Sequence, residues 1–202
     1  MKHLKEAWQA MDEDNSSTLI IVDIQPEYSD YMGFSPEDFC EWLNEKSGDI
    51  IMFWNGPELG MSSKEDIVGW YYEHGLSEEL IDSIKWHDKS YAFFRYCIDS
   101  NNAFEETVKL VRYMWKHDIN DSRDIDSSIW DEIVDELELS STRELLEFAD
   151  DCIHIPDLME VLNTIKGNIS LCGGGRHECL AEVEIALGAL GKSYKHIDEW
   201  IY

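Results

Sequence analysis

Short apolar runs that are rich in β-branched residues recur along this chain, and they restrict its fold more than any other feature. One run reads Thr-Leu-Ile-Ile-Val-Asp over residues 18–23, and another reads Asp-Ile-Ile-Met-Phe-Trp over residues 49–54. Continuous apolar runs of this length are typical of strands that are covered on both faces, as in parallel sheets. A chain with such strands can cover both faces by packing helices against the sheet.

The rest of the chain completes an alternation of predicted strands and helices. Further strands are predicted over residues 83–89, 168–172 and 193–197, and residues 91–98 fit either a strand or the start of a helix. Helices are predicted over residues 36–46, 63–75, 103–116, 129–139, 142–152, 157–165 and 177–190, with a shorter one after Ser77. The alternation implies right-handed crossovers and an α/β fold, a mostly parallel sheet flanked by helices in a Rossmann-like three-layer arrangement.

The length of 202 residues fits one domain with a core of its own. We therefore expect a single α/β domain over residues 1–202. Because the stretch 103–165 is almost wholly helical in this prediction, we expect it to be an insertion that caps the sheet.

The charge of the chain narrows the classes of partner that it can bind. Asp and Glu number 43 against 16 Lys and Arg, which gives a formal net charge of −27. Such a field repels phosphate backbones and anionic membranes, so direct nucleic-acid binding is not expected. It suits a basic protein partner, mimicry of a polyanion, or simply a well-solvated acidic surface. A homo-oligomer is also compatible with the sequence.

The cysteines and the amino-terminal segment indicate a cytoplasmic protein. Five cysteines occur at irregular spacing and without a CxxC motif: Cys40, Cys97, Cys152, Cys172 and Cys179. This pattern suggests neither a disulfide framework nor a four-cysteine zinc site, and thiols fit a reducing compartment. Residues 1–15 are polar and acidic, so we predict no signal peptide, and the apolar runs are too short to span a membrane.

Several chemically active residues follow the predicted strands directly. Asp23 and Asn55 each come after a strand, and the turn Gly173-Gly174-Gly175 separates a late strand from the helix that holds Cys179. In open parallel sheets, ligands bind beyond the carboxyl ends of the strands. The sequence therefore predicts a working site where these segments meet.

The residue types at this predicted site suit nucleophilic catalysis. Cys179 lies near the first turn of a helix, where unpaired backbone N–H groups and the helix dipole stabilise a thiolate and could hold an oxyanion. Asp23 could take the thiol proton, and Lys89 could supply positive charge to both. The alternative interpretations are that Cys179 is a small core residue, Asp23 a turn cap and Lys89 a surface lysine.

Three segments resemble the isochorismatase-like cysteine hydrolases, and they occur in the same chain order as in that family. They are Asp23 with Ile24-Gln25, Lys89 with Ser90-Tyr91-Ala92-Phe93, and Gly173 six residues before Cys179-Leu180. The resemblance implies a parallel α/β sheet, with Asp23 as base, Lys89 as stabilising cation and Cys179 as nucleophile. It also implies hydrolysis of an amide-type or related bond in a small substrate through a thioester. The Asp-x-His metal motif of the nicotinamidase members is absent, and we predict no metal or cofactor.

The substrate is expected to contact residues around the glycine turn. Arg176 and His177 add a cationic rim there, which together with helix N–H groups could bind an anionic or polar group. An exposed helix-start histidine is the alternative for His177. The predicted substrate-binding residues are Gln25, Asn55, Gly173, Gly174, Gly175, Arg176, His177 and Glu178.

Two other functions fit the same sequence. A PIN-like nuclease would gather Mg²⁺ or Mn²⁺ on carboxylates, for which the candidates are Asp23, Asp88, Asp99, Asp121, Asp124, Asp126, Glu178 and Glu182. A non-catalytic acidic binding protein, with a phage-like or regulatory role, would keep the sheet and use its charge to engage a basic partner.

Overall fold

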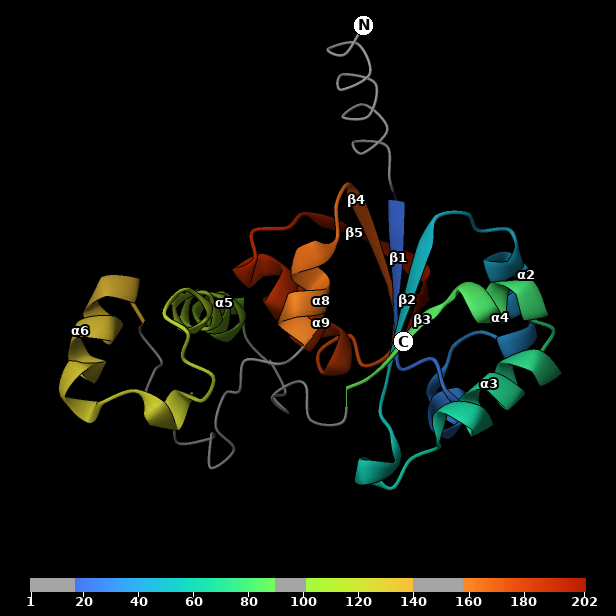
Figure 1. Ribbon diagram of the computed structural model, residues 1–202, viewed down its shortest axis with the longest axis horizontal. Coiled ribbons are helices and arrows are strands. Elements are labelled where there is room, and N and C mark those ends of the chain that lie inside the picture. The colour runs from blue at the N-terminus through green and yellow to red at the C-terminus, as the bar shows by residue number, and fades with distance from the viewer. Residues whose placement is uncertain (1–16, 90–100, 140–157) are drawn as a thin grey trace, which may run out of the picture. The chain divides into compact units, whose positions relative to one another are not determined.

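A computed structural model of the chain is shown in Figure 1, and it describes residues 17–89, 101–139 and 158–202. The chain divides into two compact units. The first comprises residues 1–90, 164–176 and 193–202, and the second comprises residues 91–163 and 177–192. The first unit contains the sheet, whereas the second contains the helices that follow the third strand together with the last helix.

The sheet confirms the predicted fold class. Its strands are β1 (Ser17–Val22), β2 (Asp49–Trp54), β3 (Lys85–Asp88), β4 (Asn168–Gly173) and β5 (Tyr194–Ile201). All neighbouring pairs are parallel, in the order β3-β2-β1-β4-β5 within the described residues. The chain is therefore an α/β protein with an all-parallel sheet flanked by helices (Figure 1).

The two apolar runs form the centre of the sheet, as their composition predicts. Every residue of β1 and β2 after the first is buried, and Leu19 pairs with Ile50 while Val22 pairs with Phe53. Side chains of successive residues point to opposite faces of a strand. Burial of every position therefore means that both faces of these strands are covered.

The strand order places a topological switch point between β1 and β4. From β1 the chain proceeds outward to β2 and β3, and it then returns to add β4 and β5 on the opposite side of β1. The last residues of the two strands beside this point, Val22 of β1 and Gly173 of β4, are partners in the register. In sheets of this kind, ligands bind at the carboxyl ends of the strands beside the switch point.

Capping residues explain where the helices of the first unit begin. These elements are η1 (Pro26–Tyr31), α2 (Pro36–Asn44), η2 (Pro57–Leu59), α3 (Lys64–Glu73) and α4 (Glu78–Ser83). The Ser35 side chain accepts a hydrogen bond from Asp38 N at 3.0 Å, and Ser63 and Asp66 form a reciprocal capping box. Figure 1 shows α2, α3 and α4 grouped beside the strands of this unit.

The core of the first unit is rich in aromatic side chains. Phe39 of α2 and Tyr71 of α3 are fully buried and pack with aliphatic residues from β1 and β2. Trp200 of β5 contacts Phe39 with 5.4 Å between ring centroids and a T-shaped geometry. Each such side chain contributes roughly 1.5–3 kcal/mol by leaving water, so this cluster attaches the helices to the sheet.

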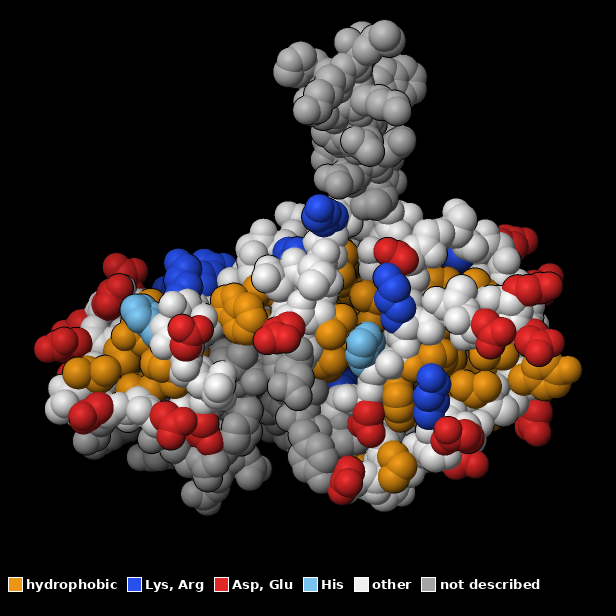
Figure 2. Space-filling model, in the orientation of Figure 1, with side chains coloured by type: hydrophobic (Ala, Val, Ile, Leu, Met, Phe, Trp, Pro, Cys, Tyr) orange, Lys and Arg blue, Asp and Glu red, His pale blue; other side chains and the backbone are white. Residues whose placement is uncertain are grey.

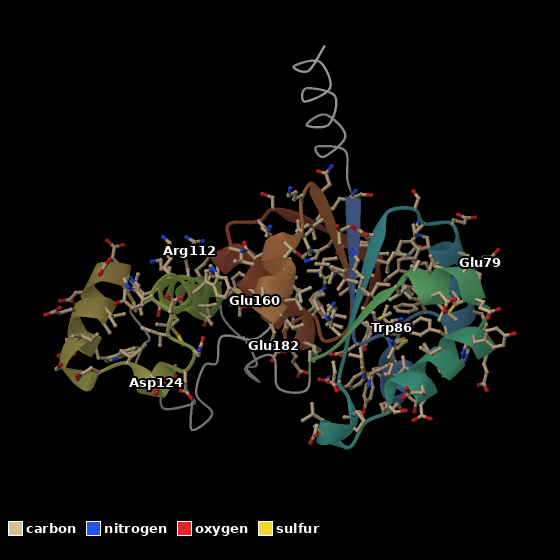
Figure 3. The ribbon with its side chains drawn as sticks, in the orientation of Figure 1. Glu79, Trp86, Arg112, Asp124, Glu160 and Glu182 are labelled. Atoms are coloured by element: carbon tan, nitrogen blue, oxygen red, sulfur yellow. The ribbon has the colours of Figure 1, made fainter. Side chains whose placement is uncertain are left out.

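The second unit is built around the contact between two helices. Its elements are α5 (Asn101–Lys116), η3 (Ser122–Asp124), α6 (Ser127–Leu137), most of α8 (Leu158–Thr164) and α9 (Cys179–Ala189). Arg112 of α5, labelled in Figure 3, donates hydrogen bonds to the carbonyls of Gly188 at 2.6 Å and Ala189 at 3.2 Å. Lys109 likewise donates to the carbonyl of Leu137 at 2.9 Å. Side chains of α5 therefore add hydrogen bonds to carbonyl groups in the last turns of α9 and α6, where helices have fewer backbone N–H donors of their own.

Some boundaries differ from the predicted ones. Helix α6 begins at Ser127 rather than 129, because Asp126 accepts a hydrogen bond from Ser128 N and caps it. Helix α9 begins at Cys179 rather than 177, and β5 continues to Ile201 rather than ending at 197. The elements predicted over residues 91–98 and 142–152, and the segment 1–15, lie outside the described residues.

The surface agrees with the acidic composition. On the face shown in Figure 2, Asp and Glu side chains are spread over α6 and over α2–α4. Among the helices that the structure describes, none is both long and apolar enough to cross a membrane.

Candidate functional site

Asp23 lies just past the end of β1 and has an unusual backbone conformation. Its φ is +52°, in the left-handed region, which Asp tolerates better than most residues but still at a cost of about 1 kcal/mol. Its amide donates to Phe53 O at 2.9 Å, so the residue remains attached to β2. The side chain is only 1% exposed.

Lys89 directly follows β3, and its side chain contacts Asp23. Its backbone N–H donates to Trp54 O at 2.8 Å, which continues the register between β2 and β3. Its ammonium Nζ lies 2.9 Å from Asp23 Oδ2, and the Lys89 side chain is 2% exposed. Two residues that are 66 positions apart in the sequence therefore form a buried ion pair at the carboxyl edge of the sheet.

Asn55, which follows β2, completes this cluster. Its Nδ2 donates to Asp23 Oδ2 at 3.1 Å and to the hydroxyl of Tyr28 at 3.1 Å. Gln25 holds Asn55 in place, because its Oε1 accepts from Asn55 N at 2.9 Å and its Nε2 donates to Asn55 O at 3.2 Å. We refer to Asp23, Asn55 and Lys89 as the edge cluster.

The two oxygens of the Asp23 carboxylate have different surroundings. Oδ2 receives both the Lys89 ammonium and the Asn55 amide, whereas Oδ1 is buried and has no hydrogen-bond partner within the described structure. A buried acceptor without a partner costs roughly 1–3 kcal/mol. Oδ1 is therefore the atom of the edge cluster best suited to accept a proton or an N–H or O–H group.

Glu27 links the edge cluster to the loop before α3. Its Oε2 accepts from Gln25 Nε2 at 2.9 Å, and its Oε1 accepts from Ser62 N at 2.6 Å. Burial raises the pKa of Glu27, but the hydrogen bonds from Ser62 and Gln25 outweigh it, so the pKa of this carboxyl is lowered. Both N–H donors of the Gln25 amide are thus engaged inside the protein, and its predicted contact with a substrate stays a prediction.

Backbone geometry accounts for the three glycines of the turn. Gly173 and Gly175 have φ values of +119° and +61°, which favour glycine. A side chain on Gly173 would overlap the Val22 carbonyl, and one on Gly174 would overlap the ring of Tyr202. Gly174 N also donates to Val22 O at 2.8 Å. The turn therefore lets the chain pass closely over the end of β1.

Two tyrosines at the edge cluster were not predicted from the sequence. Tyr28 is the hydrogen-bond partner of Asn55, and the Tyr202 hydroxyl donates to the carbonyl of Asp23 at 2.7 Å. The second contact joins residues 179 positions apart. Periodicity within a segment carries no signal for such a contact, because it depends on β5 lying beside β4.

The remaining predicted site residues follow the glycine turn. Arg176 Nη2 lies 2.8 Å from Asp198 Oδ1, and this hydrogen bond from Arg176 lowers the pKa of Asp198. His177 and Glu178 are exposed, and Cys179 is partly exposed as the first residue of α9. The division between the two units falls between Arg176 and His177, so Cys179 belongs to the second unit. Its predicted cooperation with Asp23 and Lys89 stays a prediction.

The thiols of the described residues differ in their surroundings. Burial, with a smaller contribution from Glu37, raises the pKa of Cys40 to about 12. Burial also raises the pKa of Cys172 far above its ordinary value. Burial and a raised pKa both disfavour the reactive thiolate at Cys40 and Cys172, whereas Cys179 is partly exposed. Cys97 and Cys152 lie outside the described residues.

The carboxylates proposed as metal ligands do not gather in the part of the chain that the structure describes. Within residues 17–89, 101–139 and 158–202, no group of three or more His, Cys, Asp or Glu side chains could hold a metal ion. Asp88 lies against Gly56, and Glu182 of α9, labelled in Figure 3, is 5% exposed. Asp99 lies outside the described residues.

Comparisons with known proteins leave the family of this chain open. Neither a protein-family model, nor a curated protein, nor a solved structure matches it.

Proposed function

We propose that this chain is a cysteine hydrolase that acts on a small substrate with an amide-like or related bond. In this proposal Asp23 is the base, Lys89 the cation that holds it, and Cys179 the nucleophile. The observation that carries the proposal is the buried ion pair between Asp23 Oδ2 and Lys89 Nζ at 2.9 Å, together with Oδ1 of the same carboxylate, which has no hydrogen-bond partner among the described residues.

The energetic cost of the pair supports a functional role. Removing two charges from water costs several kcal/mol per ion, and replacing a buried pair by apolar residues is often neutral or stabilising. The chain nevertheless holds Asp23 in a left-handed conformation, with one carboxylate oxygen unsatisfied within the part of the chain that the structure describes. Strain and unsatisfied polar atoms of this kind cluster at functional sites.

The proposed chemistry proceeds in two stages. The Cys179 thiol gives its proton to the Asp23 carboxylate, and the thiolate attacks the carbonyl carbon of the substrate. The carbon–nitrogen bond breaks, and the amine leaves with the proton from Asp23, so that a thioester remains on Cys179. Water then attacks the thioester, which releases the carboxylic acid and restores the thiol.

The position of Cys179 in its helix also supports the proposal. It is the first residue of the 11-residue helix α9, where backbone N–H groups without helical partners favour a thiolate. Arg176 lies three positions earlier and is exposed, although one of its terminal nitrogens already pairs with Asp198. We propose that Arg176 binds an anionic or polar group of the substrate.

The same contacts weigh against the metal-dependent nuclease. Donors occupy Asp23 Oδ2, and one of them is the positively charged Lys89 ammonium. A divalent cation on this carboxylate would lie beside that ammonium and be repelled by it. The edge cluster therefore favours a base held by an amine over a carboxylate that ligates Mg²⁺ or Mn²⁺.

Acylation by p-nitrophenyl acetate tests the proposal. We expect a burst of p-nitrophenolate and an acetyl group on Cys179, detected by peptide mass mapping. Asp23→Asn should slow the burst by about 100-fold, the scale of general base catalysis. The matched control is Asp49→Asn, which removes an exposed carboxylate that pairs with Lys85. A wild-type chain without an acetyl group on Cys179, or an Asp23→Asn variant that is acylated at the wild-type rate, would contradict the proposal.

A further inference from the structure

Tyr202 connects three segments that end at the same edge of the sheet. Its hydroxyl donates to Asp23 O at 2.7 Å, its backbone N–H donates to Gly173 O at 3.4 Å, and its carbonyl accepts from Arg176 N at 3.1 Å. Gly174 leaves the space that the phenol ring occupies, because a side chain there would overlap the ring. The ring also contacts Phe34, with 6.4 Å between centroids and a T-shaped geometry.

The two peptide groups on either side of the Asp23 Cα are both held by hydrogen bonds. In the preceding peptide, Asp23 N donates to Phe53 O at 2.9 Å and Val22 O accepts from Gly174 N at 2.8 Å. In the following peptide, Asp23 O accepts from the Tyr202 hydroxyl. Fixing both peptides fixes the direction of the Cα–Cβ bond, which carries the carboxylate toward Lys89 and Asn55.

The conformation of Asp23 needs this support. A φ of +52° is unfavourable for a residue with a side chain, and such a conformation persists only where the surrounding contacts enforce it. Without the phenol, the peptide after Asp23 loses the side-chain hydrogen bond that opposes a return to φ < 0. The carboxylate would then leave its alignment with the Lys89 ammonium.

We infer that Tyr202 is a positioning residue, which acts through the Asp23 carbonyl to aim the Asp23 carboxylate at Lys89. The inference rests on the proposed function only where it extends to catalysis by Asp23. Its structural part concerns the ion pair and can be measured without a substrate.

The test compares two tyrosine-to-phenylalanine variants that each remove one phenol-to-carbonyl hydrogen bond. Tyr202→Phe removes the bond to Asp23 O, whereas Tyr71→Phe removes a bond of 2.7 Å to the carbonyl of the next residue, Ile24. The Tyr71 hydroxyl hydrogen-bonds to Ile24 O and to the Met52 sulfur rather than to Asp23 O, so Tyr71→Phe controls for the general loss of a buried hydroxyl. Both variants keep the ring and its packing.

The first readout is the exchange rate of the Lys89 Nζ protons with water, measured from the ¹⁵N–¹H signal and assigned with Lys89→Arg. We expect exchange to be at least about tenfold faster in Tyr202→Phe, equivalent to about 1.4 kcal/mol, and unchanged in Tyr71→Phe. If Tyr202 only stabilised the fold, both variants would have a lower melting temperature, and the exchange rate of the Lys89 Nζ protons would not change. Unchanged exchange in Tyr202→Phe, or equal acceleration in both variants, would overturn the inference.

The second readout is the rate of Cys179 acylation by p-nitrophenyl acetate. We expect Tyr202→Phe to slow it by about tenfold, less than Asp23→Asn does, and Tyr71→Phe to leave it unchanged. If Lys89 exchange accelerates while acylation stays at the wild-type rate, the positioning role stands and the catalytic role of Asp23 fails. If Asp23→Asn slows acylation while Tyr202→Phe alters neither readout, the proposed function stands and the positioning role fails.

Discussion

At the scale of single residues, the chemistry of this protein centres on the edge cluster. Asp23 Oδ2 receives a charged and a neutral donor, while Oδ1 receives none within the described residues. Lys85 of β3 pairs with Asp49 of β2 in different surroundings, since both side chains are more than half exposed. The nitrogen–oxygen distances in the two ion pairs are similar, 2.9 and 3.0 Å, so comparing the pairs tests the effect of burial on their contribution to stability.

Lys89→Met should destabilise the protein far more than Lys85→Met. Removing Lys89 leaves the Asp23 carboxylate buried without its counter-charge, which costs about 3–5 kcal/mol. Removing Lys85 breaks an exposed pair worth about 0–1 kcal/mol. Urea unfolding of the two variants measures the difference. A loss below about 1 kcal/mol for Lys89→Met would show that the buried pair does not form, since an exposed pair has that energy.

Glu27 gives a pH dependence whose sign follows from its lowered pKa. A carboxyl with a folded-state pKa below the ordinary 4.5 stabilises the fold above pH 4.5, and this contribution is lost as the pH falls through the folded-state pKa. Glu27→Gln should therefore lower the free energy of unfolding by about 1 kcal/mol at pH 6.5, because Glu27 is only partly buried, and by less at pH 3.

Urea unfolding at both pH values checks this expectation, with the exposed Glu79→Gln as control. A difference between wild type and Glu27→Gln that stays constant from pH 6.5 to pH 3 would show that the hydrogen bonds from Ser62 and Gln25 do not favour the charged carboxylate.

At the scale of elements, the glycine turn at the end of β4 lets Tyr202, which follows β5, reach Asp23 at the end of β1. Three successive glycines are typical of a backbone that turns sharply or lies close to a ligand. The bend lies at Gly173 and Gly175, and the close approach is that of the Tyr202 ring to Gly174. The sequence could not show that a side chain of the same protein, rather than a ligand, occupies the space over Gly174.

Two glycine-to-alanine substitutions should change stability in opposite directions. At Gly173 a methyl group would overlap the Val22 backbone and φ is +119°, so Gly173→Ala should cost at least about 2 kcal/mol. Gly69 lies within α3 with nothing within 4 Å of an added Cβ, so Gly69→Ala should stabilise the protein by about 0.5–1 kcal/mol. Thermal unfolding measures both. A Gly173→Ala variant as stable as wild type would contradict the close passage over β1.

At the scale of the whole molecule, the sequence predicted the class of fold well. Local patterns determine where the strands run, because continuous apolar runs need cover on both faces, and β1 and β2 have that cover. The side chains of Asp23, Asn55 and Lys89 could be expected near one another, because parallel strands end at a common edge. The role of Gln25 could not be predicted, because a side chain that hydrogen-bonds to a neighbouring backbone leaves no periodic trace.

The division of the chain into two compact units could not be predicted from local sequence patterns either. The sequence predicts one domain with a helical insertion, whereas the contacts group the segment 177–192 with residues 91–163. Helix α9 is apolar around most of its circumference, and α5 packs on it closely enough that an added Cβ on Gly188 would lie 3.3 Å from Val108. A helix that is apolar on all sides does not show in its own sequence which element it packs against, because that choice depends on tertiary packing.

The proposed partnership of Asp23 and Cys179 is tested most directly by the alkylation rate of Cys179 with iodoacetamide at pH 7. We predict that Cys179 reacts at least about tenfold faster in the folded protein than in 8 M urea, and that Asp23→Asn removes this advantage in the folded state only. The buried thiols of Cys40 and Cys172 should stay unlabelled until the protein unfolds. A folded Cys179 that reacts no faster than in urea, or equally fast with Asn at position 23, would contradict the account.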